Sequence, residues 1–322
     1  MDAYLFVHFV GTESTPEHEQ VYFSVSVDGR NWEILNKAKP ILVSEVGEKG
    51  ARDPYIIRSV EGNHFYIIAT DLSIYHRMQK NDEKTSWRQC TNAFTDNPNP
   101  GSRGIVVWES DDLLHWSAGR LQMVAPTDGG CFWAPKCIWD KEKQANMVVG
   151  SSKTSEDGYG WLRLYRTYTA DFQTFSEAEV YVDMAQDCSE KAEENNIHII
   201  DCDFIEWKNK YYRVYAANRI RVDTADSLNG NWQAVPTNIH ELATRHEGPA
   251  ICQENGKDSC LLMLDNLHTR GGYQPFVAEN LNNGQFLSAA EATSFTEGVK
   301  YRHGSLLAIT QEEYDRLRQF YL

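Results

Sequence analysis

The feature that most constrains the fold is a strand-and-turn pattern that recurs along the chain. In each copy an apolar strand runs into Ser, Thr or Glu, then Asp or Asn, then a short turn and an aromatic residue. The copies are YFSVSVDGRNW (22–32), VVWESDDLLHW (106–116), YRTYTADFQTF (165–175), VDTADSLNGNW (222–232) and FVAENLNNGQF (276–286). A four-stranded unit repeated in this way is typical of propellers. The repeat therefore predicts an all-β, five-bladed β-propeller, in which we interpret the turns themselves as structural.

A second series of strands runs in phase with the first and opens with polar or special residues. Its members are RDPYII (52–57), FWAPKCIW (132–139), IIDCDFIEW (199–207), HEGPAI (246–251) and YRHGSLLAI (301–309). The innermost strands of a propeller all begin at one end of a central funnel. We therefore expect a convergence there of Asp53, Trp133, Asp201, Glu247 and His303.

The fifth unit needs both ends of the chain, because YRHGSLLAI lies near the C-terminus and YLFVHFV (4–10) near the N-terminus. Pairing the two would close the ring and leave no open sheet edge. We expect a single catalytic propeller domain over residues 1–322, with the polar stretch 77–103 as an inserted loop. A helical period is present only in QEEYDRLRQFYL at the C-terminus and in EKAEEN (190–195).

Composition limits the partners. The net charge is −15 and the pI near 5.1, which argues against nucleic acid or an anionic membrane as a partner. No apolar run reaches the ~18 residues of a membrane helix, and the seven cysteines lack a C-x-x-C pair, as expected for idle thiols in a reducing compartment. The chain as given is expected to be cytoplasmic, or secreted or periplasmic if a signal peptide was removed. We expect a monomer or a weak homo-oligomer.

Three of the converging residues are carboxylic acids. Charged groups at the mouth of an apolar funnel are costly unless they are used or paired, and mutual repulsion should raise the pKa of at least one. A protonated carboxyl can act as a general acid and an ionised one as a general base, which is the pair that glycosidic bond cleavage needs. Simpler interpretations stay open: Asp53 and Asp201 could cap turns, Asp203 competes with Asp201, and Trp133 and His303 could be core residues.

These motifs, in their order and spacing, resemble glycoside hydrolase family 43. The resemblance rests on Asp53 in GARDPYIIRS, Asp201 in IIDCDF, Glu247 in HEGPAI, WAP at 133–135 and RHG at 302–304. It implies a general base at Asp53, a residue that tunes the acid's pKa at Asp201 and a general acid at Glu247. It also implies sugar contacts from Trp133, Arg302, Asp71 (in ATDLSIY) and His246. No cofactor is expected to be required, although the resemblance places His303 near a possible structural calcium at the propeller axis.

The same resemblance implies an inverting, exo-acting hydrolase that removes a terminal pentofuranosyl unit from an oligosaccharide or a polysaccharide side chain. An α-L-arabinofuranosidase is expected first, with a β-D-xylosidase or β-D-galactofuranosidase as alternatives. Lys136 after WAP, the CDF in IIDCDF and the 77–103 insertion depart from the family pattern. A retaining, fructosidase-like propeller and a sugar-binding propeller without catalysis are the competing interpretations.

Overall fold

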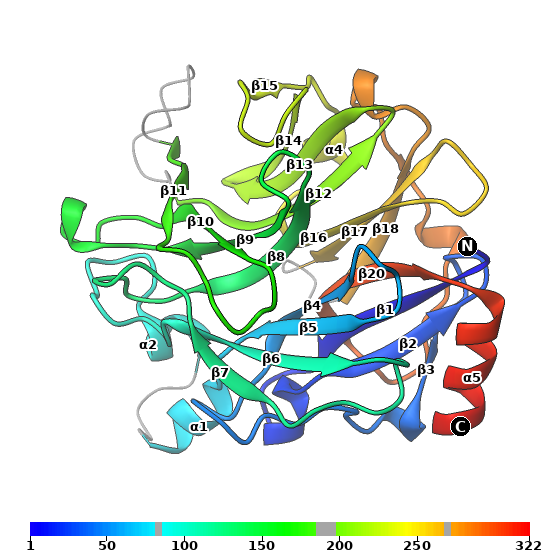
Figure 1. The fold of residues 1–322 in the computed structure, drawn as a ribbon, viewed down its shortest axis with the longest axis horizontal. Helices are drawn as coiled ribbons and strands as arrows, with labels where there is room; N and C mark the ends of the chain where they lie inside the picture. The colour runs from blue at the N-terminus through cyan, green and yellow to red at the C-terminus, as the bar shows by residue number, and fades with distance from the viewer. Residues whose placement is uncertain (81–85, 185–197, 267–271) are drawn as a thin grey trace.

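The computed structural model describes residues 1–80, 86–184, 198–266 and 272–322. Its strands form five antiparallel sheets of four strands each, arranged around a common axis (Figure 1). The prediction of a five-bladed β-propeller is confirmed. In order from the axis outward, three blades are β4 (Arg52–Arg58), β5 (Phe65–Thr70), β6 (Gly104–Ser110) and β7 (Arg120–Met123); β8 (Trp133–Asp140), β9 (Ala145–Ser152), β10 (Arg163–Thr169) and β11 (Glu179–Val182); and β12 (Ile200–Trp207), β13 (Lys210–Ala217), β14 (Arg219–Ala225) and β15 (Gln233–Ala234).

The fourth blade contains β16 (His246–Gln253), β17 (Cys260–Asn266), β18 (Gly272–Ala278) and β19 (Leu287–Ser288). The fifth joins the two ends of the chain: β20 (Tyr301–Ile309) is its innermost strand and pairs with β1 (Ala3–Val10), followed by β2 (Tyr22–Ser26) and β3 (Glu33–Ile34). The predicted closure by both termini is therefore confirmed. The first and last parts of the chain are thereby joined in one sheet, which closes the ring of blades.

Short helices lie between the strands and at the C-terminus. The α-helices are α1 (Ile74–Gln79), α2 (Trp87–Thr91), α4 (Ile239–Leu242) and α5 (Gln311–Tyr321), and the 3-10 helices are η1 (Pro16–Glu19), η2 (Asn36–Ala38), η3 (Ser155–Asp157), η4 (Leu281–Asn283) and η5 (Ala290–Ala292). The C-terminal helix is confirmed as α5, which Thr310 and Glu313 begin with a capping box. The helix expected at 190–195 lies outside the described residues. The stretch expected as a loop, 77–103, instead contains α2 and the end of α1, because Ser73 and Ser86 cap these helices.

The turn motif of the repeat is structural. Three copies contain an aspartate whose Oδ1 accepts hydrogen bonds from two backbone N–H groups of the following turn. These residues are Asp28, Asp112 and Asp171. A Ser or Thr two residues earlier binds the same turn. Each motif thereby satisfies backbone donors in the turn that leads to the outermost strand of its blade.

Buried polar side chains join the innermost strands across the gaps between blades. The Ser305 hydroxyl donates to the Pro54 carbonyl and accepts from Ile56 N–H, joining β20 to β4. The Tyr273 hydroxyl donates to the Gly248 carbonyl at 2.6 Å and accepts from Gly304 N–H at 2.8 Å, joining β16 to β20. Such contacts fix the angular position of each inner strand, and hence of the side chains at its start.

A buried lysine crosses the axis below these strand starts. Lys136 is 1% exposed, and its ammonium group donates to the Gly304 carbonyl at 2.7 Å, joining β8 to β20. Asp203 on β12 is equally buried and accepts from Ile251 N–H at 2.9 Å. Lys136, the residue after WAP that departs from the family pattern, therefore packs at the propeller axis.

The remaining interior is apolar and lies between neighbouring blades, where Phe23, Trp108, Phe172, Tyr212 and Phe286 are all buried. In the described part of the chain no helix is long and apolar enough to span a bilayer. Six cysteines in that part are free thiols, and Cys188 lies outside it.

Candidate active site

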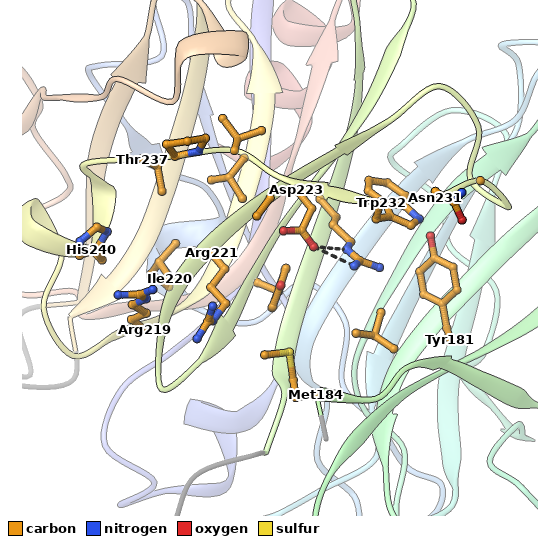
Figure 2. Close-up of a pocket in the computed structure, with 18 residues that line it drawn as sticks. Tyr181, Met184, Arg219, Ile220, Arg221, Asp223, Asn231, Trp232, Thr237 and His240 are labelled. Atoms are coloured by element: carbon orange, nitrogen blue, oxygen red, sulfur yellow. Dashed lines mark hydrogen bonds and ion pairs between the residues drawn. The ribbon is translucent and has the colours of Figure 1, made fainter. Parts of the chain in front are cut away.

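A cavity of about 830 Å³ lies on the outer side of the β12–β15 blade, around β14 and the turn before β15 (Figure 2). Its central charged groups neutralise each other, because Arg213 donates to Asp223 from Nε at 2.8 Å and from Nη2 at 2.7 Å. The same guanidinium lies 4.5 Å from the Trp232 ring centroid. Asp223 is the sole carboxylate among the described residues of its lining. This cavity therefore lacks a pair of carboxyl groups for acid–base chemistry.

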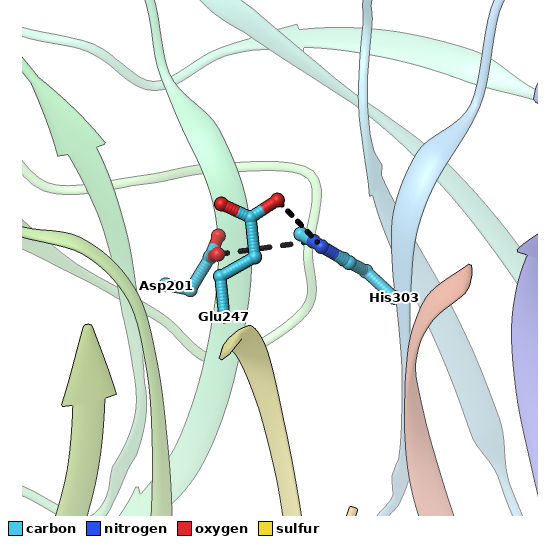
Figure 3. A group of neighbouring side chains, drawn as sticks. All are labelled: Asp201, Glu247 and His303. Atoms are coloured by element: carbon cyan, nitrogen blue, oxygen red, sulfur yellow. Dashed lines mark ion pairs between the residues drawn. The ribbon is translucent and has the colours of Figure 1, made fainter. Parts of the chain in front are cut away.

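A second cavity, of about 250 Å³, lies where the innermost strands begin; we call it the axial cavity. Asp53 from β4, Trp133 from β8, Asp201 from β12, Glu247 from β16 and His303 from β20 all line it. Figure 3 shows the carboxylates of Asp201 and Glu247 directed at the His303 imidazole. The structure thus brings together the five residues whose convergence the sequence predicts.

Local backbone distortions aim these side chains at the axis. Four innermost strands contain a bulge near their start, with a left-handed residue at Asp53 (φ 50°), Ala134 (φ 48°), Asp201 (φ 55°) and Gly248 (φ 60°). A bulge leaves one residue out of the ladder and turns the strand. Prolines follow three of the four, and proline has no N–H to leave unpaired there. The left-handed aspartates are strained, as is common at functional sites.

Gly248 explains why Glu247 precedes a Gly-Pro pair. Its φ of 60° favours glycine, and a Cβ at this position would lie 2.6 Å from His303 Cδ2. The glycine therefore allows the Glu247 strand to pass against the imidazole. The cost of any side chain here would be both backbone strain and displacement of His303.

The His303 ring divides the acidic groups into two sides. Its Nδ1 faces Asp53 Oδ1 at 3.1 Å and Asp201 Oδ2 at 3.8 Å. Its Nε2 faces Glu247 Oε1 at 3.1 Å and Asp265 Oδ2 at 3.3 Å. Burial alone would lower the pKa of His303, but the carboxylates, Asp201 first, raise it well above its usual range. A protonated imidazole is therefore the central cation of the site.

The carboxyl groups differ in their protonation. Burial alone would raise the pKa of Asp53, but His303, Arg52 and Thr70 hold it well below its usual range. Burial raises the pKa of Asp201 to about 7; Glu247 and Asp53 add to the rise, and His303 opposes it. One pKa in this group is therefore raised, as expected, but burial contributes more to the rise than repulsion by Glu247 and Asp53 does. Two carboxyl groups with opposed shifts are the arrangement that acid–base catalysis needs.

Exposure separates Glu247 from Asp201. The Glu247 side chain is 23% exposed and lines the cavity, whereas the Asp201 side chain is 3% exposed and accepts the Gly248 N–H at 3.0 Å. Asp53 is 11% exposed and accepts the Thr70 hydroxyl at 2.7 Å. Glu247 and Asp53 can thus reach a bound molecule, while Asp201 is held beneath them.

Arginine pairs support this arrangement from the side of β1. Arg302 lines the axial cavity and donates from Nε to Asp265 Oδ2 at 2.5 Å. Arg52 donates to Glu13 at 3.0 Å and to the buried Glu19 at 2.8 Å. Against the effect of burial, His303 and Arg302 lower the pKa of Asp265 to about 2. These ion pairs keep Asp265 ionised and the arginine side chains fixed.

Two residues predicted to contact sugar lie outside the lining of the axial cavity. Asp71 is buried and accepts the Glu48 N–H at 2.7 Å, so its carboxylate supports a neighbouring turn. The His246 ring contacts Gln274 Oε1 and the Thr244 carbonyl, each at 2.9 Å. His246 directly precedes Glu247 on β16, and successive side chains of a strand point to opposite faces, whereas Asp71 follows the end of β5.

Sequence reasoning missed several residues of the site. Asp265 lies near the end of the apolar strand CLLMLDN. A buried acid is costly without a partner, so its position in this strand was a signal that it has one. Arg52 directly precedes Asp53 in the motif RDP. The insertion contributes Trp87, Arg88 and Phe94 to the cavity wall. Nothing local marks these three beyond aromatic residues in a polar stretch.

Among the described residues, one group has potential metal-ligand atoms close together. It consists of Asp201, Glu247 and His303, whose donor atoms lie within 4.8 Å of one another. Both His303 nitrogens are buried without a well-aligned hydrogen bond among the described residues. Direct Ca²⁺ coordination needs about six to eight oxygen ligands, and a protonated imidazole is not a ligand. The donor set does not fit a directly coordinated calcium, so calcium at the axis stays a prediction from the sequence.

Comparisons with known proteins agree with this fold. A family model described as "Probable glycosyl hydrolase domain" matches residues 1–315. An alpha-L-arabinofuranosidase from Bifidobacterium longum subsp. longum is 27% identical over 201 residues, which cover 56% of this chain but 17% of that much longer protein. A family 117 glycoside hydrolase from Zobellia galactanivorans is 14% identical with a TM-score of 0.52, over 95% of this chain and 76% of that one.

A second solved structure, an exo-beta-1,3-galactanase from Clostridium thermocellum, is 13% identical with a TM-score of 0.51, over 77% of this chain and 51% of that one. At these identities the two structures share the fold. The family model, in contrast, spans nearly the whole chain and includes every residue that lines the axial cavity. The chain therefore belongs to this family of probable glycosyl hydrolase domains, which is related to glycoside hydrolase family 43.

Proposed function

We propose that the chain is an inverting, exo-acting glycoside hydrolase that removes a terminal pentofuranosyl unit, with α-L-arabinofuranoside as the first substrate. The observation that carries this proposal is the arrangement of Asp53 and Glu247 on opposite nitrogens of His303 in the axial cavity. The name of the Bifidobacterium relative supports the choice of sugar. β-D-Xyloside and β-D-galactofuranoside are the alternatives that the same cavity size allows.

In the proposed reaction Glu247 protonates the leaving oxygen, because its side chain is 23% exposed, whereas that of Asp201 is 3% exposed. Asp53, ionised through its contacts with His303, accepts a proton from the attacking water. That water attacks the anomeric carbon from the opposite face. Asp201 stays buried next to Glu247, and its negative charge would keep the acid protonated once Asp201 ionises.

The spacing of the two reacting groups supports inversion. Asp53 and Glu247 are each 3.1 Å from a different nitrogen of the same ring, so the ring separates them. This favours the wider carboxyl separation of inverting enzymes, roughly 6.5–9.5 Å, over the ~5–5.5 Å of retaining enzymes. The wider gap leaves room for the water.

Exo action is supported by the insertion. Trp87 lies 5.6 Å from Trp133 and 5.7 Å from Phe94 between ring centroids, which forms an aromatic wall over one side of the axial cavity. A cavity of about 250 Å³ behind this wall suits a single sugar unit rather than the middle of a chain. Aromatic faces are also suited to packing on sugar rings.

The test is a screen on nitrophenyl α-L-arabinofuranoside, β-D-xyloside and β-D-galactofuranoside, with Asp53→Asn as the inactive control. We expect turnover on the first substrate and a first-formed product of inverted configuration by NMR. A retained anomer would exclude the inverting mechanism. Absence of turnover on every glycoside would favour the sugar-binding alternative. Chelation by EDTA should leave the rate unchanged if no divalent ion acts in the reaction.

A further inference from the structure

A third cavity, of about 420 Å³, adjoins the axial cavity; we call it the outer cavity. The two share Glu13, Trp87, Arg88 and Arg302 in their linings, so these four side chains form the boundary between them. The insertion supplies Trp87 and Arg88 from α2, and the fifth blade supplies the other two. A molecule larger than one sugar could therefore extend from the axial cavity into the outer cavity.

The outer cavity lies on the side of the site that holds Glu247. Its lining includes Asp265 and Asn266, which pair across the sheet with Glu247 and His246. Asp265 also faces the same His303 nitrogen as Glu247, whereas Asp53 faces the other nitrogen. If Glu247 protonates the leaving oxygen, the departing part of the substrate lies on this side.

The charge of the boundary is informative in a chain with a net charge of −15. Arg302 is neutralised by Asp265 at 2.5 Å and approaches Glu13 at 3.5 Å. Arg88 is exposed, and its recorded contact among the described residues is with the Phe94 ring, 5.6 Å from the centroid, rather than with a carboxylate. The Arg88 guanidinium is therefore a cation at the boundary that retains its hydrogen-bonding capacity for a ligand.

We propose that the outer cavity is a leaving-group subsite that prefers a sugar bearing a carboxylate, a uronic acid unit, with Arg88 as the residue that recognises it. A guanidinium binds a carboxylate through two parallel hydrogen bonds, which gives both affinity and orientation. The inference rests on the proposed function for the identity of the leaving-group side. The presence of a carboxylate-binding subsite at Arg88 does not depend on turnover.

The experiment compares galacturonate with galactose, which differ at one carbon by a carboxylate in place of a hydroxymethyl group. Their binding is measured by calorimetry, and their inhibition of nitrophenyl arabinofuranoside hydrolysis is measured in parallel. We expect galacturonate to bind the wild-type chain at least ~10-fold more tightly than galactose, and the difference to shrink at high salt. Arg88→Gln should remove the preference, and Arg88→Lys should retain part of it.

The matched control is Arg316→Gln, which removes the same charge from the exposed face of α5 and should keep the full preference. Equal binding of the two sugars, a preference that survives Arg88→Gln, or binding of neither sugar would overturn the proposal. An Arg88-dependent preference for galacturonate in calorimetry, without turnover on any glycoside, would retain the subsite and reject the proposed function. Turnover without an Arg88-dependent preference would do the reverse.

Discussion

Replacing Asp201 with Asn tests whether Asp201 holds a proton on the acid. The pKa of Asp201 is raised to about 7, and its carboxylate lies beside Glu247 in the axial cavity. We expect the pair to act through the proton that Asp201 holds, so loss of this proton should end acid catalysis. The alkaline limb of kcat/KM should therefore lie near pH 7 and belong to the pair. The asparagine can still accept the Gly248 N–H but adds no negative charge next to Glu247.

The size of the shift follows from the separation of the groups. At an effective dielectric constant of about 20, charges no more than 4.8 Å apart interact by roughly 3 to 4 kcal/mol or more. At about 1.4 kcal/mol per pKa unit, this corresponds to a shift of about 2 to 3 units. We expect the alkaline limb to move down by this amount in Asp201→Asn. Activity at pH 7 would then fall roughly 100- to 1000-fold, because each pH unit beyond the limb costs about tenfold.

The assay is a pH series of kcat/KM between pH 4 and 9 on an alkyl glycoside, whose poor leaving group requires the acid. Glu206→Gln is the matched control, since Glu206 lies on the same strand β12 but is exposed and pairs with Lys141. The control should keep the wild-type limb. An alkaline limb in Asp201→Asn that stays within half a unit of the wild type would refute the shared proton.

Four further substitutions test the site and the fold. Glu247→Gln should lower turnover by about 10²–10⁴-fold on alkyl glycosides and less on nitrophenyl glycosides, and equal losses would contradict its role as the acid. Asp53→Asn should lose activity to a similar degree and regain part of it with azide, giving a product of inverted configuration by NMR; more than a tenth of wild-type turnover without azide would exclude it as the base. Burial lowers the pKa of His8 from 6.5 to about 3, so between these pH values His8 gains a proton in the unfolded chain but not in the folded one. The free energy of unfolding should therefore fall by about 1.4 kcal/mol for each unit that the pH decreases below 6.5, and urea unfolding of His8→Gln should lack this contribution. Lys136→Met should lower the free energy of unfolding by about 3–5 kcal/mol, whereas the control Lys143→Met on an exposed turn should change it by less than about 0.5 kcal/mol. A similarly small change in both variants would show that Lys136 is dispensable for stability.

The sequence by itself determined the number of blades and their closure. The turn motif recurs because the turn before the outermost strand has backbone donors to satisfy, as Asp28, Asp112 and Asp171 do in three blades. It also identified the starts of the innermost strands, because Asp53 and Glu247 begin runs that are otherwise apolar. Patterns of this kind are local, since alternation and turn chemistry depend on near neighbours in the chain.

The tertiary structure alone decided which side chains reach the axis. Asp71 directly follows β5 and supports a turn, while Asp265 contacts His303 across blades. His246 contacts Gln274, which lies two strands away on β18 of the same blade. None of these contacts is written in the spacing of residues, because bulges at the strand starts rotate each side chain separately.

The protonation of the site was equally beyond the sequence. Asp53 and Asp201 begin equivalent strands with equivalent backbone conformations, yet the pKa of Asp53 is lowered and that of Asp201 is raised. The difference arises because Asp53 has Arg52, Thr70 and the nearer contact with His303, whereas Asp201 lies beside Glu247. Charge interactions depend on distances of a few ångströms between residues that are far apart in the chain, and only folding sets those distances.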